Sequence, residues 1–126
     1  MKIWKTVFLF LLWALLTGSG SIIAAGEVDE LIKDLSSGDK VKRREAARSL
    51  SLIGQEGKPA VPALVRVLDD DEEQVFFWSA TALAKIGPAA NEATPELIKR
   101  LERSRRRYKD QVHVRIVHAL TQIGPQ

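Results

Sequence analysis

The chain of 126 residues contains no cysteine and only two histidines. Without cysteine it forms no disulfide, no thiolate zinc site and no thioether-linked haem, and it carries no lipid-modified cysteine. His113 and His118 lie five positions apart, whereas paired metal ligands on one helix face lie at i and i+3 or i+4. The serines of the expected helices, Ser49, Ser51 and Ser79, have no histidine and acid at a usable spacing. We therefore expect a non-enzymatic protein without a metal or another cofactor.

Residues 1–25 differ in composition from the rest of the chain. Lys2 and Lys5 precede an unbroken apolar run, Val7–Leu16, and a Gly/Ser-rich stretch follows at 17–21. A basic start, a short apolar run and small residues are typical of a secretory signal peptide. We therefore expect residues 1–25 to direct export.

Cleavage of this segment would follow Ser21 or Ala25 and would leave the domain of residues 26–126 in the periplasm or outside the cell. The alternative is an uncleaved membrane anchor over residues 7–25, although a Gly/Ser stretch in its middle is poor for a helix in lipid. Both interpretations place the remaining domain outside the cytoplasm.

The net charge of the expected domain is small. The chain carries 19 Lys and Arg against 16 Asp and Glu, and two of the lysines lie within residues 1–25. A nearly neutral, exported domain is a poor match for a polyanion, so we expect no nucleic-acid partner.

The remaining chain repeats with a period of 33 residues, which becomes 37 in the last interval. The first interval matches Leu31, Leu35, Ala47, Leu50, Ile53 and Gly54 with Leu64, Leu68, Ala80, Leu83, Ile86 and Gly87. The last interval matches Val75, Ala82, Leu83, Ile86, Gly87 and Pro88 with Val112, Ala119, Leu120, Ile123, Gly124 and Pro125. A period in this range is typical of a stacked solenoid, so we place repeats at about 27–57, 58–90 and 91–126.

The pattern of each repeat predicts two helices. In the middle repeat, the segment from Val61 to Leu68 has apolar residues at the spacing of an amphipathic helix. Gly87 is expected to end the second helix as a left-handed C-cap, and Thr94 to start the next helix as its N-cap. One hairpin cannot bury its own apolar face, so we expect the three to stack on a continuous core. The expected helices cover 27–36, 40–54, 61–69, 72–87, 94–107 and 110–124.

A resemblance to the HEAT repeat lies in residues 86–97, IGPAANEATPEL, preceded by Val75. More narrowly, the segment is similar to the short variety named after phycobilisome lyases. The resemblance implies an all-α solenoid, a superhelical stack of three helix hairpins, with a protein-interaction or scaffold function. A lyase-like or enzyme-accessory role is the alternative that the subtype implies. The family usually has Arg after the second-helix valine, and the equivalent positions here are Arg43, Phe76 and His113.

Three consecutive aromatics, Phe76, Phe77 and Trp78, cannot all face one core, because successive helical positions point about 100° apart. Val75 and Ser79 define the inward face, so at least one of Phe76 and Phe77 should lie on the outer side of the second helix. This predicts an apolar, Arg-flanked surface that binds a partner protein. The predicted partner-binding residues are Arg43, Arg44, Phe76, Phe77, His113 and Val114. The alternative is that the aromatics fill gaps between helices.

The segment 99–109 is strongly basic, and the equivalent turn of the previous repeat, 69–73, is acidic. The basic patch would suit attachment to an anionic surface. Stacking places equivalent turns side by side, so the two turns would instead neutralise each other. The residues of the basic patch are Arg103, Arg105, Arg106, Arg107 and Lys109.

The last second helix is apolar nearly all round, from Val112 to Ile123. An end of this kind exposes apolar surface. We expect it to associate with itself or with a partner, unless the chain belongs to a longer array.

Overall fold

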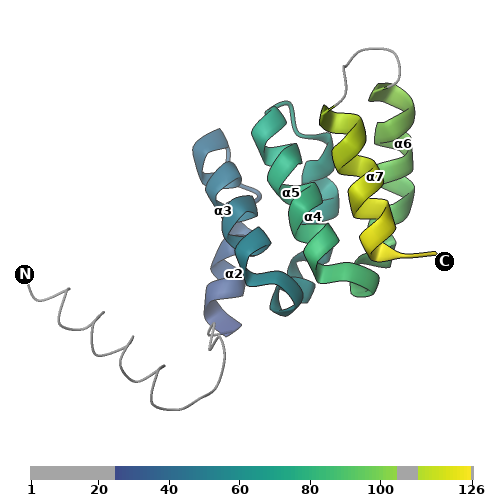
Figure 1. Cartoon of the computed structure of the whole chain (residues 1–126). Helices are drawn as coiled ribbons and strands as arrows, with labels where there is room; N and C mark the ends of the chain where they lie inside the picture. Colours follow the sequence, from purple (N-terminus) through teal and green to yellow (C-terminus); the bar gives the residue numbers. More distant parts are fainter. Residues whose placement is uncertain (1–24, 105–110, 126) are drawn as a thin grey trace, which may run out of the picture.

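The computed structural model describes residues 25–104 and 111–125, which form helices and turns without any β-strand (Figure 1). The α-helices of these residues are α2 (Ala25–Asp34), α3 (Lys40–Ile53), α4 (Val61–Arg66), α5 (Glu73–Ile86), α6 (Thr94–Ser104) and α7 (Gln111–Ile123). Their 3-10 helices are η1 (Gly54–Ala60), η2 (Val67–Asp69) and η3 (Gly87–Ala93). The predicted all-α solenoid is confirmed.

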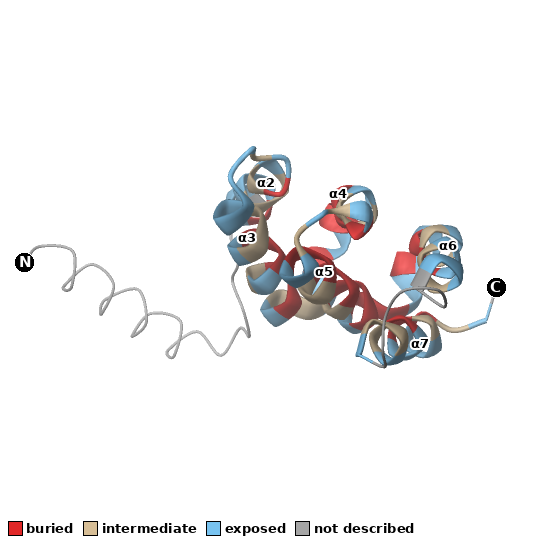
Figure 2. Cartoon of the chain, turned by 90° about the horizontal axis from the view of Figure 1, so that it is seen from above, coloured by how far each residue is buried: buried red, intermediate tan, exposed pale blue. Residues whose placement is uncertain are grey.

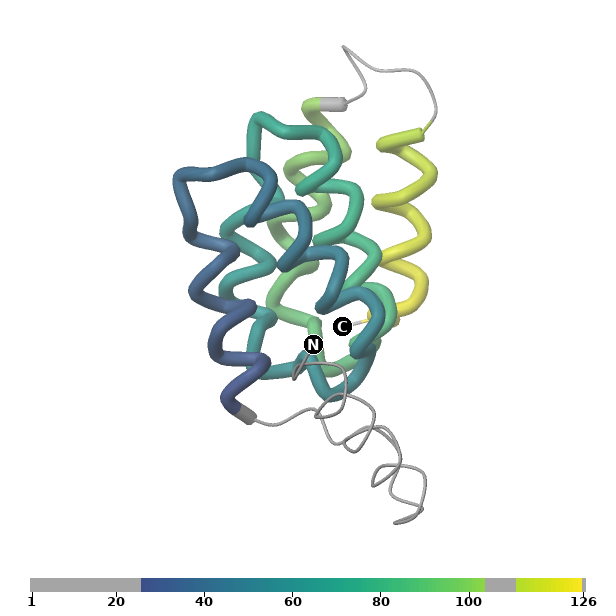
Figure 3. The backbone as a smooth tube through the Cα atoms, turned by 90° about the vertical axis from the view of Figure 1, so that its left-hand side faces the viewer, coloured from purple at the N-terminus to yellow at the C-terminus, as the bar shows by residue number. Residues whose placement is uncertain are grey.

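The helices pair into hairpins that stack in two layers. Helix α2 packs on α3, α4 on α5 and α6 on α7, and the second helices also pack on one another, α3 on α5 and α5 on α7. Figure 2 shows α3, α5 and α7 as one layer and α2, α4 and α6 as the other, with buried residues between them. Figure 3 looks along the stack from the side of α2 and shows the hairpins one behind another. Each hairpin therefore completes its core with its neighbour, as in other solenoids.

Each second helix ends at a glycine with a positive φ angle. Gly54, Gly87 and Gly124 have φ angles of 68°, 73° and 90°, which residues with a Cβ rarely adopt. The N–H of Gly87 donates a hydrogen bond to the carbonyl of Leu83 and closes the last turn of α5. The predicted glycine cap at the end of α5 is confirmed.

The start of α6 differs from the sequence-based prediction. Thr94 was expected to cap the helix, but η3 runs directly into α6 and Thr94 already has helical angles, φ −54° and ψ −49°. Its hydroxyl is buried and has no hydrogen-bond partner among the described residues. The N-cap prediction was wrong because the preceding 3-10 turn already supplies the helical start. The last turn of the predicted helix 61–69 is likewise 3-10, as η2.

The core runs along the seam between the two layers. A side chain of Leu or Phe size that is fully buried stabilises a fold by about 1.5–3 kcal/mol relative to its exposed state. Helix α5 lies between α3 and α7, so it is covered on two sides, and this position decides which of its aromatic residues reach the surface. The largest fully buried apolar side chains are Phe76, Leu35, Leu50, Leu64, Leu68, Leu83, Leu97, Ile116 and Val75.

Candidate protein-interaction surface

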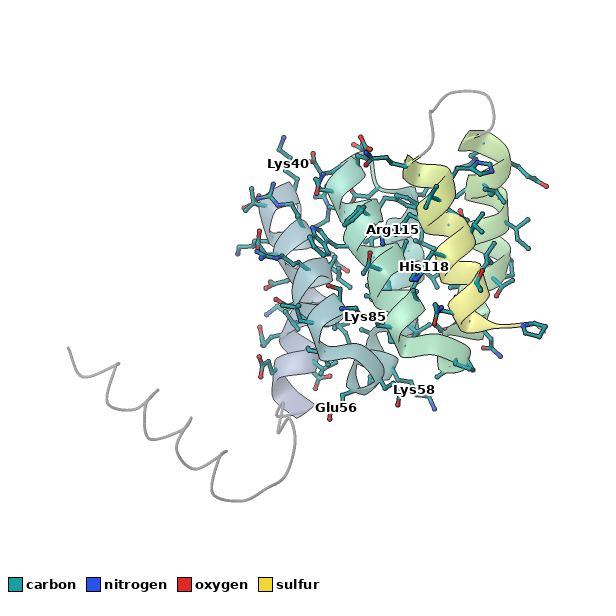
Figure 4. All side chains as sticks on the ribbon, viewed as in Figure 1. Lys40, Glu56, Lys58, Lys85, Arg115 and His118 are labelled. Carbon is teal, nitrogen blue, oxygen red and sulfur yellow. The ribbon has the colours of Figure 1, made fainter. Side chains whose placement is uncertain are left out.

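The second helices α3, α5 and α7 present one continuous face on the side away from α2, α4 and α6. Figure 4 shows Lys85, Arg115 and His118 on this face. Residues 33 or 37 positions apart occupy the same place in successive repeats, so they form rows across the face, such as Arg44, Phe77 and Val114. We define the second-helix surface as the exposed and half-buried residues Arg44, Arg48, Phe77, Trp78, Thr81, Lys85, Val114, Arg115 and His118.

Four of these side chains form a row across the three helices. The rings of Phe77 and Trp78 meet edge to face, with centroids 5.0 Å apart and planes at 89°. The guanidinium group of Arg115 lies 4.1 Å from the centroid of the Phe77 ring, and that of Arg48 lies 5.9 Å from the Trp78 ring. Cation–aromatic contacts at a surface contribute about 0.5–1 kcal/mol each. We call this row the aromatic strip, and it holds guanidinium groups of α3 and α7 against the rings of α5.

The second-helix surface is basic. Glu45 is its acidic neighbour, with its carboxylate 3.4 Å from Arg44 and 3.8 Å from Arg48. These pairs are exposed to solvent, so they neutralise little charge. Arg115 has no ion-pair partner among the described residues. The aromatic strip therefore keeps positive charge available to a group from outside.

A hollow of about 210 Å³ opens beside Arg115, between α5 and α7. Sites for small molecules and cofactors usually measure about 300–1,000 Å³. The hollow is therefore better suited to a single side chain of a partner than to a metabolite. Its lining residues are Glu73, Gln74, Phe76, Phe77, Gln111, Val112 and Arg115.

Residues 28–113 match the sequence pattern of a family described as HEAT repeats. The chain belongs to the HEAT repeat family. HEAT repeats generally mediate protein–protein interaction and typically form non-catalytic scaffolds. A comparison with curated proteins finds no match. The narrower likeness to the phycobilisome-lyase type is not addressed by the family match and stays a prediction.

Several of the residues predicted to bind a partner lie on the second-helix surface of these HEAT repeats. Val114 is 67 % exposed, and Phe77 and Arg44 are half-buried. His113 is also half-buried, and it takes part in a contact within the protein. The structure thus brings Arg44, Phe77 and Val114 into one row, and their binding of a partner stays a prediction.

Phe76 and Arg43 were predicted on the same surface, but the structure places them between the HEAT repeats. Phe76 is 1 % exposed, and the guanidinium group of Arg100 lies 4.9 Å from its ring centroid. Arg43 is held by the carboxylate of Asp70 in the next repeat. The alternative, that aromatics fill gaps between helices, is correct for Phe76. The surface prediction was wrong there because α5 is covered by both α3 and α7, so its buried arc is wider than one face.

The sequence-based prediction missed three residues of the aromatic strip, namely Arg48, Trp78 and Arg115. Two signals would have pointed to them. Arg48 lies one helical turn after Arg44, and Arg115 stands 37 positions after Trp78, in the same place of the next HEAT repeat. These spacings place the residues on one surface, but they do not show that guanidinium groups would stack on the rings.

The described part of the basic segment 99–109 contacts the acidic turn 69–73. The carboxylate of Asp69 accepts hydrogen bonds from Arg103 at 2.6 Å and from Arg100 at 3.2 Å. These contacts favour mutual neutralisation over attachment of Arg103 to an anionic surface. The other residues of the predicted basic patch lie outside the described residues, and they are Arg105, Arg106, Arg107 and Lys109.

Two further findings concern residues 25–104 and 111–125 alone. In these stretches no three His, Asp or Glu side chains gather closely enough to hold a metal ion. None of the helices in the same stretches is both long and apolar enough to cross a membrane. His113 and His118 share helix α7, the first half-buried and the second exposed.

Proposed function

We propose that this HEAT-repeat protein is a non-enzymatic interaction module that binds a partner protein through its second-helix surface. The aromatic strip carries the proposal, because Phe77 and Trp78 lie there between two guanidinium groups. Aromatic and Arg side chains supply most of the binding energy in many protein interfaces. Side chains that already pack against one another lose little conformational freedom when a partner arrives. The aromatic strip therefore has the residue composition of a binding site, and its side chains are already ordered by their contacts with one another.

Site-specific photo-cross-linking in cells of the source organism tests this proposal. A cross-linking residue at Thr81 or at His118, both on the second-helix surface, should give the same discrete adduct with a partner. The matched control is Arg66, which is exposed on α4 in the other layer and should give no such adduct. Phe77→Ala in the Thr81 cross-linking protein should remove the adduct. Equal adducts from Thr81 and Arg66, or an adduct that survives Phe77→Ala, would contradict the proposal.

We further propose that the repeats act in the periplasm or outside the cell. The support is the signal-peptide pattern of residues 1–25, with an uncleaved anchor over residues 7–25 as the alternative. Cell fractionation with intact-mass measurement separates the two. A mature chain that begins after Ser21 or Ala25 supports cleavage, and a full-length chain in the membrane fraction supports the anchor. A full-length chain in the cytoplasmic fraction contradicts both.

A separate proposal concerns the end of the stack formed by α6 and α7. Val117 and Leu120 occupy the places that Ala80 and Leu83 occupy in α5, where both are fully buried. In α7, by contrast, Val117 is 47 % exposed, and together with Leu120 it lines a shallow depression that is largely open to solvent. We define the end face as Val117, Leu120, Thr121, Gly124 and Pro125.

We propose that a second copy of this chain covers the end face, with the same face used on both copies. In the two earlier repeats, the equivalent positions are covered by another second helix of the same protein. Helix α3, at the opposite end of the stack, exposes Lys42 and Glu45 at the places where α5 carries Val75 and Trp78, beside the exposed apolar residues Val41 and Leu52. A head-to-tail contact would bury these charges without partners, which is costly. A two-fold contact instead brings apolar surface onto apolar surface.

A further inference from the structure

We propose that the partner segment bound by the second-helix surface is acidic, and that one uncharged apolar side chain of this segment enters the hollow between α5 and α7 while a neighbouring carboxylate pairs with Arg115. This inference rests on the proposed function and names the chemistry of the partner. Three observations support it. Arg115 has no carboxylate partner among the described residues, the hollow has the volume of a side chain, and most charged residues around both are basic.

Arg115 differs from the other arginines of the second helices. Arg43 is bound to Asp70, and Arg44 and Arg48 lie beside Glu45, whereas Arg115 has no carboxylate partner among the described residues. Its guanidinium group lies 4.1 Å from the centroid of the Phe77 ring, so one face is covered by the aromatic side chain. A guanidinium carries several N–H donors in one plane, and those of Arg115 form no ion pair among the described residues. Arg115 therefore presents oriented donors of the geometry that a carboxylate accepts.

The hollow beside Arg115 has a lining that is part apolar and part polar. Phe76, Phe77 and Val112 supply the apolar part, and Phe76 is 1 % exposed. Its volume of about 210 Å³ is smaller than the ~300 Å³ at which small-molecule sites begin. An anchoring side chain in a pocket of this kind is the usual centre of a protein interface. The hollow therefore accepts an apolar residue of the partner and places the adjacent residue beside Arg115.

The charges around the aromatic strip favour a partner segment of negative charge. Arg44, Arg48, Lys85 and Arg115 lie on the second-helix surface, against two exposed acids, Glu45 beside Arg44 and Glu73 in the lining of the hollow. Complementary charge raises the association rate and disfavours partners of like charge, so a basic segment is repelled. Within the hollow, the carboxylate of Glu73, in the first turn of α5, would repel a carboxylate of the partner. The anchor is therefore uncharged, and the acidic residues of the partner lie beside it.

Selection from a displayed library of random short peptides, with the purified protein as bait, tests the inference without assuming a partner. The expected peptides contain one large apolar residue flanked by Asp or Glu. A synthetic copy of the best peptide should perturb backbone amide resonances near Phe77 and Arg115. Arg115→Glu should weaken its binding by about tenfold or more, because it replaces attraction by repulsion. Arg66→Glu makes the same charge change on the other layer and should alter the dissociation constant by less than about twofold.

The outcomes distinguish this inference from the proposed function. Peptides without acidic enrichment that lose binding in Phe77→Ala but not in Arg115→Glu would overturn the inference and leave the proposed function standing. Peptides that bind independently of both residues would overturn both. A selection that yields no peptide would also overturn the inference, since it requires that a short segment suffices. Unchanged circular dichroism and thermal unfolding of each variant would assign a loss of binding to the surface and not to the fold.

Discussion

The guanidinium group of Arg43 donates two parallel hydrogen bonds to the carboxylate of Asp70, from Nε at 2.7 Å and from Nη2 at 3.1 Å. Its Nη1 also donates to the carbonyl oxygens of Ser37 and Gly38, at 2.9 and 3.2 Å. Arg43 belongs to the first hairpin and Asp70 to the turn of the second. This side chain therefore joins the turns of two successive repeats, in addition to their apolar packing.

This pair makes the stability of the stack depend on pH. Burial by itself would raise the pKa of Asp70, but hydrogen bonds from Arg43 and from the Glu72 N–H outweigh it, with the charges of Arg43 and Arg100 acting in the same direction. The pKa of Asp70 is therefore held below its ordinary value of 3.8. Because the folded state lowers this pKa, ionised Asp70 stabilises the fold above about pH 4, and the stabilisation is lost as the pH falls through the lowered pKa.

We expect Asp70→Asn to lower the melting temperature by about 5 °C at neutral pH, because it removes the charge from a bidentate pair. The difference from the wild type should narrow as the pH falls below about 4, where the wild-type carboxylate also becomes neutral. Thermal unfolding followed by circular dichroism over this pH range measures it. Asp71→Asn, in the exposed neighbouring residue, should follow the wild type at every pH. If the melting temperature of Asp70→Asn stays below that of the wild type by the same amount in acid, the shape of the side chain and not its charge explains the destabilisation.

The hydroxyl of Ser79 is fully buried on α5 and has no hydrogen-bond partner among the described residues. The equivalent positions of the other repeats hold Ala46 and Ile116, so an apolar side chain fits this place. We expect Ser79→Ala to raise the free energy of unfolding by about 1 kcal/mol, because it removes the cost of burying an unpaired hydroxyl. Urea unfolding measures the change.

Ser51 provides the matched control for Ser79. It is also fully buried in a second helix, but its hydroxyl donates to the carbonyl oxygen of Arg48 at 2.7 Å. Ser51→Ala loses this bond and should give no increase in stability. Equal stabilisation of the two variants would indicate that helix propensity, and not the unpaired hydroxyl, explains the effect.

The repeat period predicted the fold well because it is a property of the core. Leu50 and Leu83 recur at the same place of the hairpin and are both fully buried. Gly87 was predicted to end its helix, and its φ angle of 73° explains why glycine is needed there. These features depend on local sequence and on contacts between equivalent positions. They can therefore be inferred from spacing alone.

The candidate site could be predicted only in part, because it depends on contacts between residues that the period does not relate. Spacing predicted that at least one of Phe76 and Phe77 lies on the outer side of the second helix, and the structure shows that this residue is Phe77. Spacing did not predict that the guanidinium group of Arg115 would lie over the ring of Phe77, since this contact depends on side-chain conformation and on how closely α5 and α7 approach. Phe76 was misplaced for a related reason, since only the packed structure shows that α5 is covered on two sides.

The two adjacent phenylalanines of α5 should separate stability from binding. Phe76 is 1 % exposed, whereas Phe77 is half-buried on the second-helix surface. We expect Phe76→Ala to lower the free energy of unfolding by about 3–5 kcal/mol, because it leaves a cavity in the core. Phe77→Ala should cost about 1 kcal/mol, through lost contact area and the contact with Arg115. Urea unfolding of both variants tests this, and similar losses would contradict the assignment of Phe77 to the surface.

Association through the end face should respond to charge at Val117. Because two-fold contact buries this side chain in both copies, Val117→Lys places two like charges together and should weaken dimerisation by about tenfold or more. Leu52→Lys is the control, since Leu52 is 73 % exposed on α3, near the opposite end of the stack, and its replacement should leave dimerisation unchanged. Sedimentation velocity over a range of concentrations measures both. A wild-type protein that remains monomeric at ~100 µM would refute the contact, since mass action favours the dimer most at high concentration.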